Sequence, residues 1–313
     1  MITIKSDGNV IPSTVPIYRN GSHYHFAGNI SGYILVERDN IVIDGEGYFL
    51  KVSSASPVVG RNGMFLSGRN NVTIQNVQIQ TAWHGISIEN CSNITISTVT
   101  VTQSLHGVFL HNSSNNNIVG NILASNYRDG IQIVESHNNI IHRNTIRANL
   151  EEGITLERSS NNSITENALE RNLDGIAFIE SPYNRIIANN ITTNTDTGMW
   201  IYKSAENLVS RNNFIDNPRQ IYTFESHNAW NNSLQGNYWS DYTDVDLYSG
   251  PYQNETGSDG IWDNPYVIDE NNQDNYPIVP EFPQALIPPL FAVLSATAVA
   301  LAKKRKEKAS SMK

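Results

Sequence analysis

Apolar and polar residues alternate in short stretches along most of this chain, and each stretch begins with a glycine. The clearest stretches begin at Gly63, Gly85, Gly107, Gly130, Gly153, Gly175 and Gly198. Successive glycines are 22 or 23 residues apart, and the first and third residues after each glycine are apolar. Alternation with a period of two predicts β-strands that bury one face. A fixed period of this length predicts stacked repeats, none of which can bury its apolar side alone.

A second phrase, Asn-x-apolar-x-x-Asn, recurs in phase with the glycines. Its first asparagines are Asn121, Asn144, Asn167, Asn189 and Asn212. In a parallel stack, equivalent residues lie about 4.8 Å apart, so we expect ladders of hydrogen-bonded amides at corners where asparagine adopts the left-handed conformation. A helical solenoid is excluded because the apolar runs are short and Asn, Ser, Thr and Gly are poor helix formers. The pattern predicts an all-β parallel β-helix of eight to ten coils, in which each glycine begins a strand where the chain leaves a corner.

Two further columns follow each strand. From Gly85 onward the sixth residue after the glycine is small, as Cys91 and Ser113 illustrate, so we interpret the single cysteine as a packing residue. The fifth residue alternates in charge from coil to coil, as in Glu135, Arg158 and Glu180. Because like charges directly opposite one another repel, this alternation favours a structural role.

The decay of the repeat at both ends divides the chain into segments. We expect an N-terminal cap and first coils at 1–62, the repeats at 63–235 and a C-terminal cap segment at 236–276. A linker at 277–284, a transmembrane anchor at 285–302 and a cytoplasmic basic tail at 303–313 should follow. The expected fold is therefore a solenoid with a C-terminal cap segment and one C-terminal transmembrane helix.

The C-terminal apolar run suggests a membrane anchor. Residues 285–302 carry no charge, and about 17–25 apolar residues span a bilayer. The basic cluster 303–306 should stay cytoplasmic, which places the upstream residues outside the cell; the alternative is an amphipathic or disordered tail. Residues 1–5 lack the apolar core of a signal peptide, so we expect the export signal to be missing from this sequence. Asn-x-Ser/Thr sequons predict a glycoprotein; they begin at Asn20, Asn29, Asn71, Asn90, Asn93, Asn112, Asn161, Asn190, Asn231 and Asn254.

The charge balance narrows the class of partner. The chain has a net charge of −9. Without the basic tail, residues 1–302 hold 15 basic and 29 acidic residues. Nucleic acid is excluded as a partner because phosphates require basic patches. Divalent cations and extracellular glycans stay compatible with this surface.

Several phrases resemble one known family. They are Ser-Asn-Asn-x-Ile at 114–118 and 160–164, Asp-Gly-Ile at 129–131, Gly-Asn-Tyr-Trp-Ser-Asp-Tyr at 236–242, and Asp-Gly-Ile-Trp-Asp-Asn-Pro-Tyr at 259–266. They resemble the NosD-like periplasmic copper-binding proteins of the carbohydrate-binding and sugar hydrolase (CASH) group, over roughly residues 30–283. The resemblance implies a right-handed parallel β-helix and a carbohydrate or copper role. Pro-Glu-Phe-Pro at 280–283, with the apolar run, resembles the C-terminal anchor signals of archaeal surface proteins.

The column just before the glycines holds the candidate chemistry. It reads His84, His106, Asp129, Glu152 and Asp174. Neighbouring carboxylates in register would approach the about 5–5.5 Å spacing of a retaining glycosidase, and alternate ones the wider inverting range. Asp129, Glu152 and Asp174 are therefore the catalytic candidates, with hydrolysis and lyase chemistry both open. His84, His106 and Asp129 are candidate ligands for copper. The alternative is ordinary turn chemistry.

A second candidate surface is aromatic. Trp200, Tyr202, Tyr222 and Phe224 fall at outward positions of the late coils. Flat amphipathic rings suit sugar binding; the alternative is that the C-terminal segment covers them.

The C-terminal segment holds a further candidate metal site. Asp259 and Asp263 are candidate calcium ligands, and a solvated loop is the alternative. The EF-hand order of ligands is absent there.

These features predict a membrane-anchored cell-surface protein that binds extracellular polysaccharide, with or without hydrolase or lyase activity. Calcium and copper are the candidate cofactors. A structural or adhesin protein of the envelope and a copper accessory protein are the alternatives.

Overall fold

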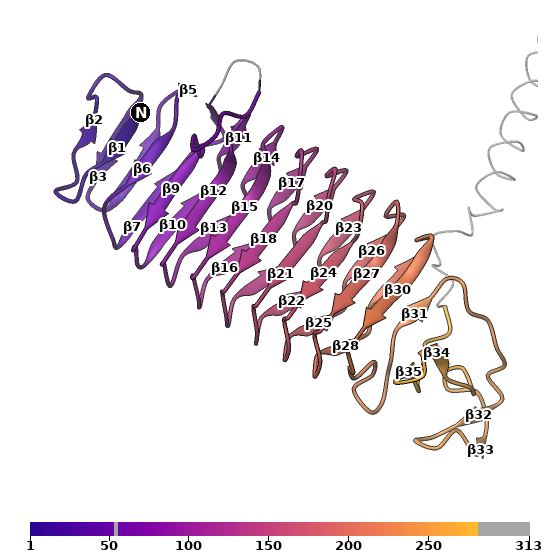
Figure 1. Ribbon diagram of the computed structural model, residues 1–313. Helices are drawn as coiled ribbons and strands as arrows, with labels where there is room; N and C mark the ends of the chain where they lie inside the picture. The colour runs from indigo at the N-terminus through magenta and orange to yellow at the C-terminus, as the bar shows by residue number, and fades with distance from the viewer. Residues whose placement is uncertain (53–55, 281–313) are drawn as a thin grey trace, which may run out of the picture. The chain divides into compact units, whose positions relative to one another are not determined.

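The computed structural model describes residues 1–52 and 56–280. Met1–Ile278 form one unit, a β-solenoid of about nine turns in which consecutive coils lie next to each other (Figure 1). Three sheets run along the stack, and we name them A, B and C. The predicted all-β solenoid is confirmed.

The sheets contain 11, 10 and 10 strands. Sheet A consists, in order, of β2 (Val10–Ile11), β1 (Ile2–Ile4), β6 (Ile34–Val36), β9 (Met64–Ser67), β12 (His84–Glu89), β15 (His106–His111), β18 (Ile131–Val134), β21 (Ile154–Glu157), β24 (Ile176–Ile179), β27 (Thr197–Tyr202) and β30 (Arg219–Phe224). Sheet B consists of β28 (Leu208–Ser210), β25 (Arg185–Ile187), β22 (Ser163–Thr165), β19 (Ile140–His142), β16 (Asn117–Val119), β13 (Thr95–Ser97), β10 (Val72–Gln75), β7 (Ile41–Asp44), β4 (His23–Phe26) and β3 (Ile17–Asn20). Sheet C consists of β31 (Tyr238–Trp239), β29 (Asn213–Ile215), β26 (Asn190–Thr192), β23 (Ala168–Glu170), β20 (Thr145–Arg147), β17 (Ile122–Ala124), β14 (Thr100–Thr102), β11 (Gln78–Gln80), β8 (Phe49–Lys51) and β5 (Ile30–Ser31).

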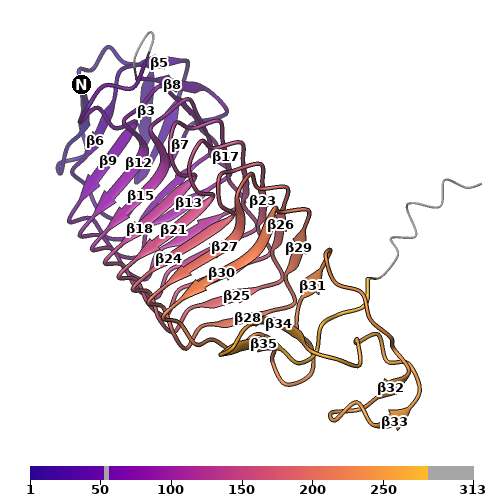
Figure 2. The ribbon, with the colours of Figure 1, turned by 45° about the vertical axis from the view of Figure 1, so that its right-hand side comes forward.

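Two small hairpins follow the stack. They pair β32 (Tyr248–Ser249) with β33 (Glu255–Thr256), and β34 (Tyr266–Asp269) with β35 (Asn272–Asp274). Figure 2 shows the strands of sheet A as successive rungs, with these hairpins beyond the last coil.

The apolar alternation produces the core. In β18, Ile131 and Ile133 point inward and are 0% exposed, and Ile131 pairs with Ile154 of the next coil. Parallel pairing in this register repeats from coil to coil, so each apolar residue packs against its equivalents above and below.

The repeated glycines lie at the beginnings of the sheet-A strands, as predicted. Their role there is not a left-handed conformation, because the repeat glycines do not have positive φ. Instead, a Cβ built on Gly153 would lie 2.5 Å from the carbonyl oxygen of Gly175. Glycine is therefore required because the backbone of the next coil approaches too closely for any side chain.

The asparagine columns form the predicted amide ladders. The Nδ2 of Asn144 donates to Oδ1 of Asn167 at 2.9 Å, and the Nδ2 of Asn167 donates to Oδ1 of Asn189 at 3.0 Å. The prediction that the ladder asparagines adopt the left-handed conformation is wrong, because none of them has positive φ. The residue before each ladder asparagine takes that conformation instead, as Arg143 does with φ 53° and Glu166 with φ 54°, which turns the following asparagine inward.

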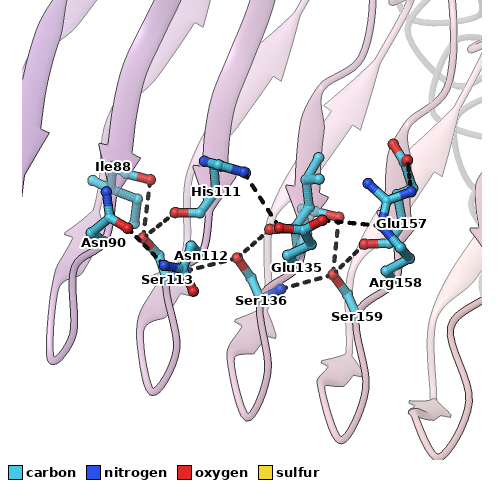
Figure 3. Close-up of polar contacts among 12 residues, drawn as sticks. Ile88, Asn90, His111, Asn112, Ser113, Glu135, Ser136, Glu157, Arg158 and Ser159 are labelled. Atoms are coloured by element: carbon cyan, nitrogen blue, oxygen red, sulfur yellow. Dashed lines mark hydrogen bonds and ion pairs between the residues drawn. The ribbon is translucent and has the colours of Figure 1, made fainter.

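The serine column forms an equivalent ladder at another corner (Figure 3). The backbone N–H of Ser113 donates to Oγ of Ser136 at 2.9 Å, and that of Ser136 donates to Oγ of Ser159 at 3.1 Å. Cys91 extends this column as a buried free thiol. The charged residues just before the serines lie outside, and Arg158 pairs with Glu135 at 3.2 Å.

All these ladders have the same direction. Each asparagine or serine N–H donates toward the next, more C-terminal coil, so the last coil needs acceptors. The amide ladders number three among the described residues: the two predicted columns, which contain Asn144 and Asn149, and a third that contains Asn139 and ends at Asn228. Later side chains supply the acceptors for all three. Asn228 N–H donates to Oδ1 of Asn272 at 3.0 Å, Asn237 N–H donates to Oδ2 of Asp274 at 2.6 Å, and Asn217 Nδ2 donates to Oε1 of Gln220 at 2.9 Å.

The C-terminal part of the sequence lies largely outside the described residues. This applies to the predicted anchor at 285–302, the basic tail at 303–313 and the linker beyond residue 280. Within 1–52 and 56–280, no helix has the length and apolar character required to cross a bilayer.

Candidate functional site

The residues that directly precede the repeat glycines, from His84 to Asp174, lie in a row along one border of sheet A. His84 pairs directly with His106. Gly130 N–H donates to the carbonyl of Glu152, and Gly153 N–H donates to that of Asp174. Strand pairing therefore places Asp129, Glu152 and Asp174 on successive coils, in the row that the sequence predicts.

A groove of about 330 Å³ opens along this row. Its lining combines the three candidate carboxylates with the ring of Trp200, which β27 contributes. The full lining is Asp129, Gln132, Glu151, Glu152, Thr155, Glu157, Asp174, Ala177, Ile179 and Trp200. The structure thus brings one predicted sugar-binding ring to the predicted catalytic residues.

Asp129 is the most buried carboxylate of the row. Its side chain is 3% exposed, and its Oδ1 accepts no hydrogen bond from any described residue. Burial raises the pKa of Asp129 well above its usual range, and the adjacent Glu152 side chain raises it further. The physical reason is that two carboxylates in a poorly solvated site cannot both ionise freely.

Asp174 lies two coils further on and is better satisfied. Its side chain is 8% exposed, and Oδ1 accepts the backbone N–H of Thr197 at 2.9 Å. Burial raises the pKa of Asp174 to about 6, although the hydrogen bond from Thr197 opposes the shift. The row therefore contains carboxyl groups with distinct acidities.

A compact acidic cluster occupies one part of the groove. Each of Asp129, Glu151 and Glu152 offers one carboxylate oxygen, and these oxygens lie within 4.8 Å of one another. Arg128 is the nearby cation, with Nε 3.6 Å from Oε1 of Glu151. One guanidinium does not balance three carboxylates.

The two histidines form a stacked pair further along the same border. Their Nδ1 atoms are 3.2 Å apart, and Phe109 stacks on His84 with ring centroids 4.4 Å apart. Burial lowers the pKa of His84 to about 4 and that of His106 to about 3, so both imidazoles are neutral at pH 7. Nε2 of His106 is buried without a partner in the part of the chain that the structure describes. Asp129 clusters with the glutamates and not with these histidines.

The aromatic residues pair as the repeat predicts. Trp200 lies beside Tyr222 and Tyr202 beside Phe224, and the rings of Tyr202 and Phe224 stack at 5.6 Å. Tyr222 is 37% exposed and Phe224 45% exposed. The C-terminal segment up to residue 280 therefore does not bury these two rings.

The aspartates of the C-terminal segment act in loop hydrogen bonding. Asp263 accepts the backbone N–H groups of Leu247 and Tyr248 at 3.0 and 3.1 Å, and Asp259 accepts that of Ile261 at 3.1 Å. Neither belongs to a cluster of potential metal ligands among the described residues.

Comparison with known proteins identifies the family. The family profile described as periplasmic copper-binding protein (NosD) matches residues 34–244, which is more than half of the chain. The chain belongs to the NosD family. No curated protein matches this NosD-family chain.

Solved structures share the fold at low identity. The periplasmic alginate epimerase AlgG has a TM-score of 0.52 and 16% identity, over 68% of this chain and 68% of that one. The enzymatically active domain of tailspike protein 2 from bacteriophage CBA120 has a TM-score of 0.49 and 15% identity, over 65% and 35%. Pectate lyase Pel9A has a TM-score of 0.46 and 13% identity, over 77% and 72%. The likeness to the epimerase, at 16% identity, concerns the fold of the NosD-family chain and not its chemistry.

Sequence reasoning missed the residues that form the floor of the groove. Thr155 and Ala177 occupy the outward column that holds Phe109 earlier and Trp200 later. The two small side chains lie between Gln132 and Trp200 in this column and leave a hollow on the outer face of sheet A. That drop in side-chain size is visible in the column and was the available signal.

Proposed function

We propose that this NosD-family protein binds carbohydrate along the outer face of sheet A, from the carboxylate groove to the rings of Tyr222 and Phe224. The observation that carries the proposal is the groove that combines Asp129, Asp174 and Trp200 in one lining. Carboxylates accept charge-assisted hydrogen bonds from sugar hydroxyls, and an indole ring offers a flat apolar surface with a polar edge. Hydrogen-bond acceptors beside an aromatic platform are the complement of a sugar.

The charge of the groove favours a neutral glycan when no cation is bound. Five carboxylate residues line it. Two guanidinium groups lie beside them, and both are already paired, Arg128 with Glu151 and Arg158 with Glu157. A polyuronate would bring like charge against this surface, which costs binding free energy. Hydroxyl-rich neutral chains avoid that repulsion.

A panel of neutral, acidic and amino polysaccharides tests the proposal by isothermal titration calorimetry with the full chain. We expect at least one glycan to bind and Trp200→Ala to weaken it by about fivefold or more, since an aromatic contact contributes about 0.5–1.5 kcal/mol beyond its buried area. Tyr183→Ala is the matched control because Tyr183 is a 58% exposed ring outside the groove. Equal weakening by both substitutions, or no binding to any member of the panel, contradicts the proposal.

We propose further that the carboxylate row supports cleavage of the bound glycan. Asp129 holds its proton more tightly than an ordinary carboxylic acid, as a general acid must, and Glu152 or Asp174 would act as base or nucleophile. Reducing-end release from the bound glycan should fall by orders of magnitude in Glu152→Gln and Asp174→Asn. Activity that persists in both variants removes these residues from the mechanism, and binding without release leaves an adhesin or structural role.

A copper accessory role is a second candidate, favoured by the histidine pair. His84 and His106 are neutral at pH 7, as ligating imidazoles must be, and the family description names copper binding. Copper titration followed by electron paramagnetic resonance should show nitrogen ligation that is lost in His84→Gln. A spectrum that this substitution leaves unchanged argues against copper at the pair.

We propose that the protein acts outside the cytoplasm and is held at the cell surface by residues 285–302. The family description is that of a periplasmic protein, and the apolar run followed by basic residues has the composition of an anchor. Membrane fractionation of cells that express the full chain, compared with a chain ending at residue 280, tests this. Equal release of both forms into the soluble fraction contradicts anchoring.

A further inference from the structure

We propose that Asp129, Glu151 and Glu152 bind a hard divalent cation, calcium in the first instance, in the groove of sheet A. One carboxylate oxygen from each residue lies within 4.8 Å of the other two, so a single ion between them would contact all three. The ligand set is all oxygen, which suits calcium and magnesium rather than copper or zinc.

The buried oxygen of Asp129 points to a ligand more strongly than the acidic cluster alone. Exposed carboxylates gather on many protein surfaces, where water solvates them. Asp129 is only 3% exposed, and Oδ1 receives no hydrogen bond from residues 1–52 or 56–280. A buried acceptor without a donor costs about 1–3 kcal/mol, and a cation bound in the groove would remove that cost.

The surroundings leave room for an ion and for its remaining ligands. The cluster lines the groove of about 330 Å³, and Thr155 contributes a buried hydroxyl to the same lining. Calcium takes six to eight oxygen ligands. Three carboxylates and one hydroxyl leave positions for water or for hydroxyl or carboxylate groups of a glycan.

Arg128 should weaken cation binding at this site. Its guanidinium is 3.6 Å from Glu151 and competes with an incoming cation for the same carboxylate. Removal of Arg128 should therefore tighten cation binding, whereas it should weaken binding of any anion in the groove.

The cation site rests on the geometry of the groove and stands whether or not a glycan binds there. It also separates two roles of Asp129, because a carboxyl group that ligates calcium cannot at the same time hold a proton as a general acid. Glu151 distinguishes them, since it belongs to the cation cluster and not to the proposed catalytic row.

Terbium luminescence tests the proposal on the full chain after treatment with a chelator. Tb³⁺ is an oxygen-seeking substitute for Ca²⁺, and Trp200 in the same groove can sensitise its emission. We expect saturable emission that Ca²⁺ displaces at concentrations of about 0.1–1 mM, the range of extracellular calcium modules. Trp200→Phe should remove most of the emission while calorimetric calcium affinity stays unchanged.

The variants make the assignment specific. Glu151→Gln should weaken calcium binding by about tenfold or more, since even outer-shell partners of metal sites have effects of this size, and Arg128→Gln should strengthen it. Glu206→Gln is the matched control, because it removes the same charge from an exposed turn before β28. No saturable calcium binding, or equal affinity in Glu151→Gln and Glu206→Gln, overturns the proposal. Neither result bears on the glycan panel, which fails or succeeds separately.

Discussion

Asn189 and Asn190 are neighbours in sequence but should differ sharply when each is replaced by alanine. Asn189 lies inside an amide ladder and is 0% exposed. Its Oδ1 accepts the backbone N–H of Asn167 at 2.9 Å and the Nδ2 of the same residue at 3.0 Å, and its own Nδ2 donates to the carbonyl of Ile164 at 2.9 Å. Asn190 lies on the outer face of sheet C, exposed, and accepts one hydrogen bond from Asn213.

The size of the difference follows from these contacts. Asn189→Ala leaves the backbone N–H of Asn167 buried without an acceptor, which costs about 1–3 kcal/mol. The loss of the side-chain hydrogen bonds on either side adds about 1 kcal/mol for each. We expect the free energy of unfolding to fall by about 3–5 kcal/mol, whereas Asn190→Ala should stay within about 0.5 kcal/mol of the wild type.

Urea denaturation followed by far-ultraviolet circular dichroism measures both variants, on protein made without glycosylation because Asn190 begins a sequon. The comparison uses the shift of the midpoint at a common slope. Amide hydrogen exchange gives a local check, since the N–H of Asn167 should exchange faster only in Asn189→Ala. If the two variants unfold within about 1 kcal/mol of each other, the ladders do not stabilise the stack as described.

Three other perturbations test separate parts of the structure. Acid should destabilise the protein through the histidine pair: His84 and His106 have pKa values of about 4 and about 3 in the folded state against 6.5 when unfolded, so the unfolded chain binds more protons below pH 6.5. Unfolding free energy should then fall by up to about 2 kcal/mol per histidine between pH 7 and 5; a denaturation profile that is flat over this range, or one that asparagine substitutions leave unchanged, contradicts the assignment. Asp274→Ala should lower the free energy of unfolding by about 3 kcal/mol because it removes the acceptor from several buried N–H groups. The fluorescence of Trp239, which donates to Asp274 at 3.1 Å, should then show unfolding at a lower denaturant concentration. An unchanged transition argues against the capping role. Gly153→Ala should lower the melting temperature, since overpacking costs about 1–3 kcal/mol and the new Cβ would lie 2.5 Å from a backbone oxygen. If calorimetry finds no change, the coils can separate to admit a methyl group.

The parts of the fold that repeat could be predicted from the sequence. Alternation gives the strands, and a fixed period gives the stack, because a residue such as Ile131 must meet its equivalent Ile154 in every parallel register. The ladder of Asn144 and Asn167 follows from the same reasoning. The row of Asp129, Glu152 and Asp174 follows as well, since it needs only the register and no knowledge of side-chain conformation.

Features that depend on contacts far apart in sequence could not be predicted in this way. Asn272 and Asp274 accept the last ladder donors across 44 and 37 residues, and no periodicity links them to the stack. The burial of Asp129 depends on how neighbouring side chains fill the groove. The sequence predicts the left-handed conformation at the ladder asparagines, one position after the residues that adopt it. Arg143 and Glu166 adopt it instead, and arginine and glutamate have only a weak preference for that conformation.

Because the central coils are nearly interchangeable, the outer face of sheet A can become longer or shorter when coils are duplicated or lost. The central coils meet their neighbours through the same amide, serine and apolar contacts, so a duplicated central coil can enter the stack without a new core. Insertion of a copy of residues 153–174 would move Trp200 away from Asp129 by one strand spacing, about 4.8 Å, and small-angle scattering would show the longer particle. Genetic gain or loss of coils can therefore adjust the reach of the surface in fixed steps, while each local environment stays the same.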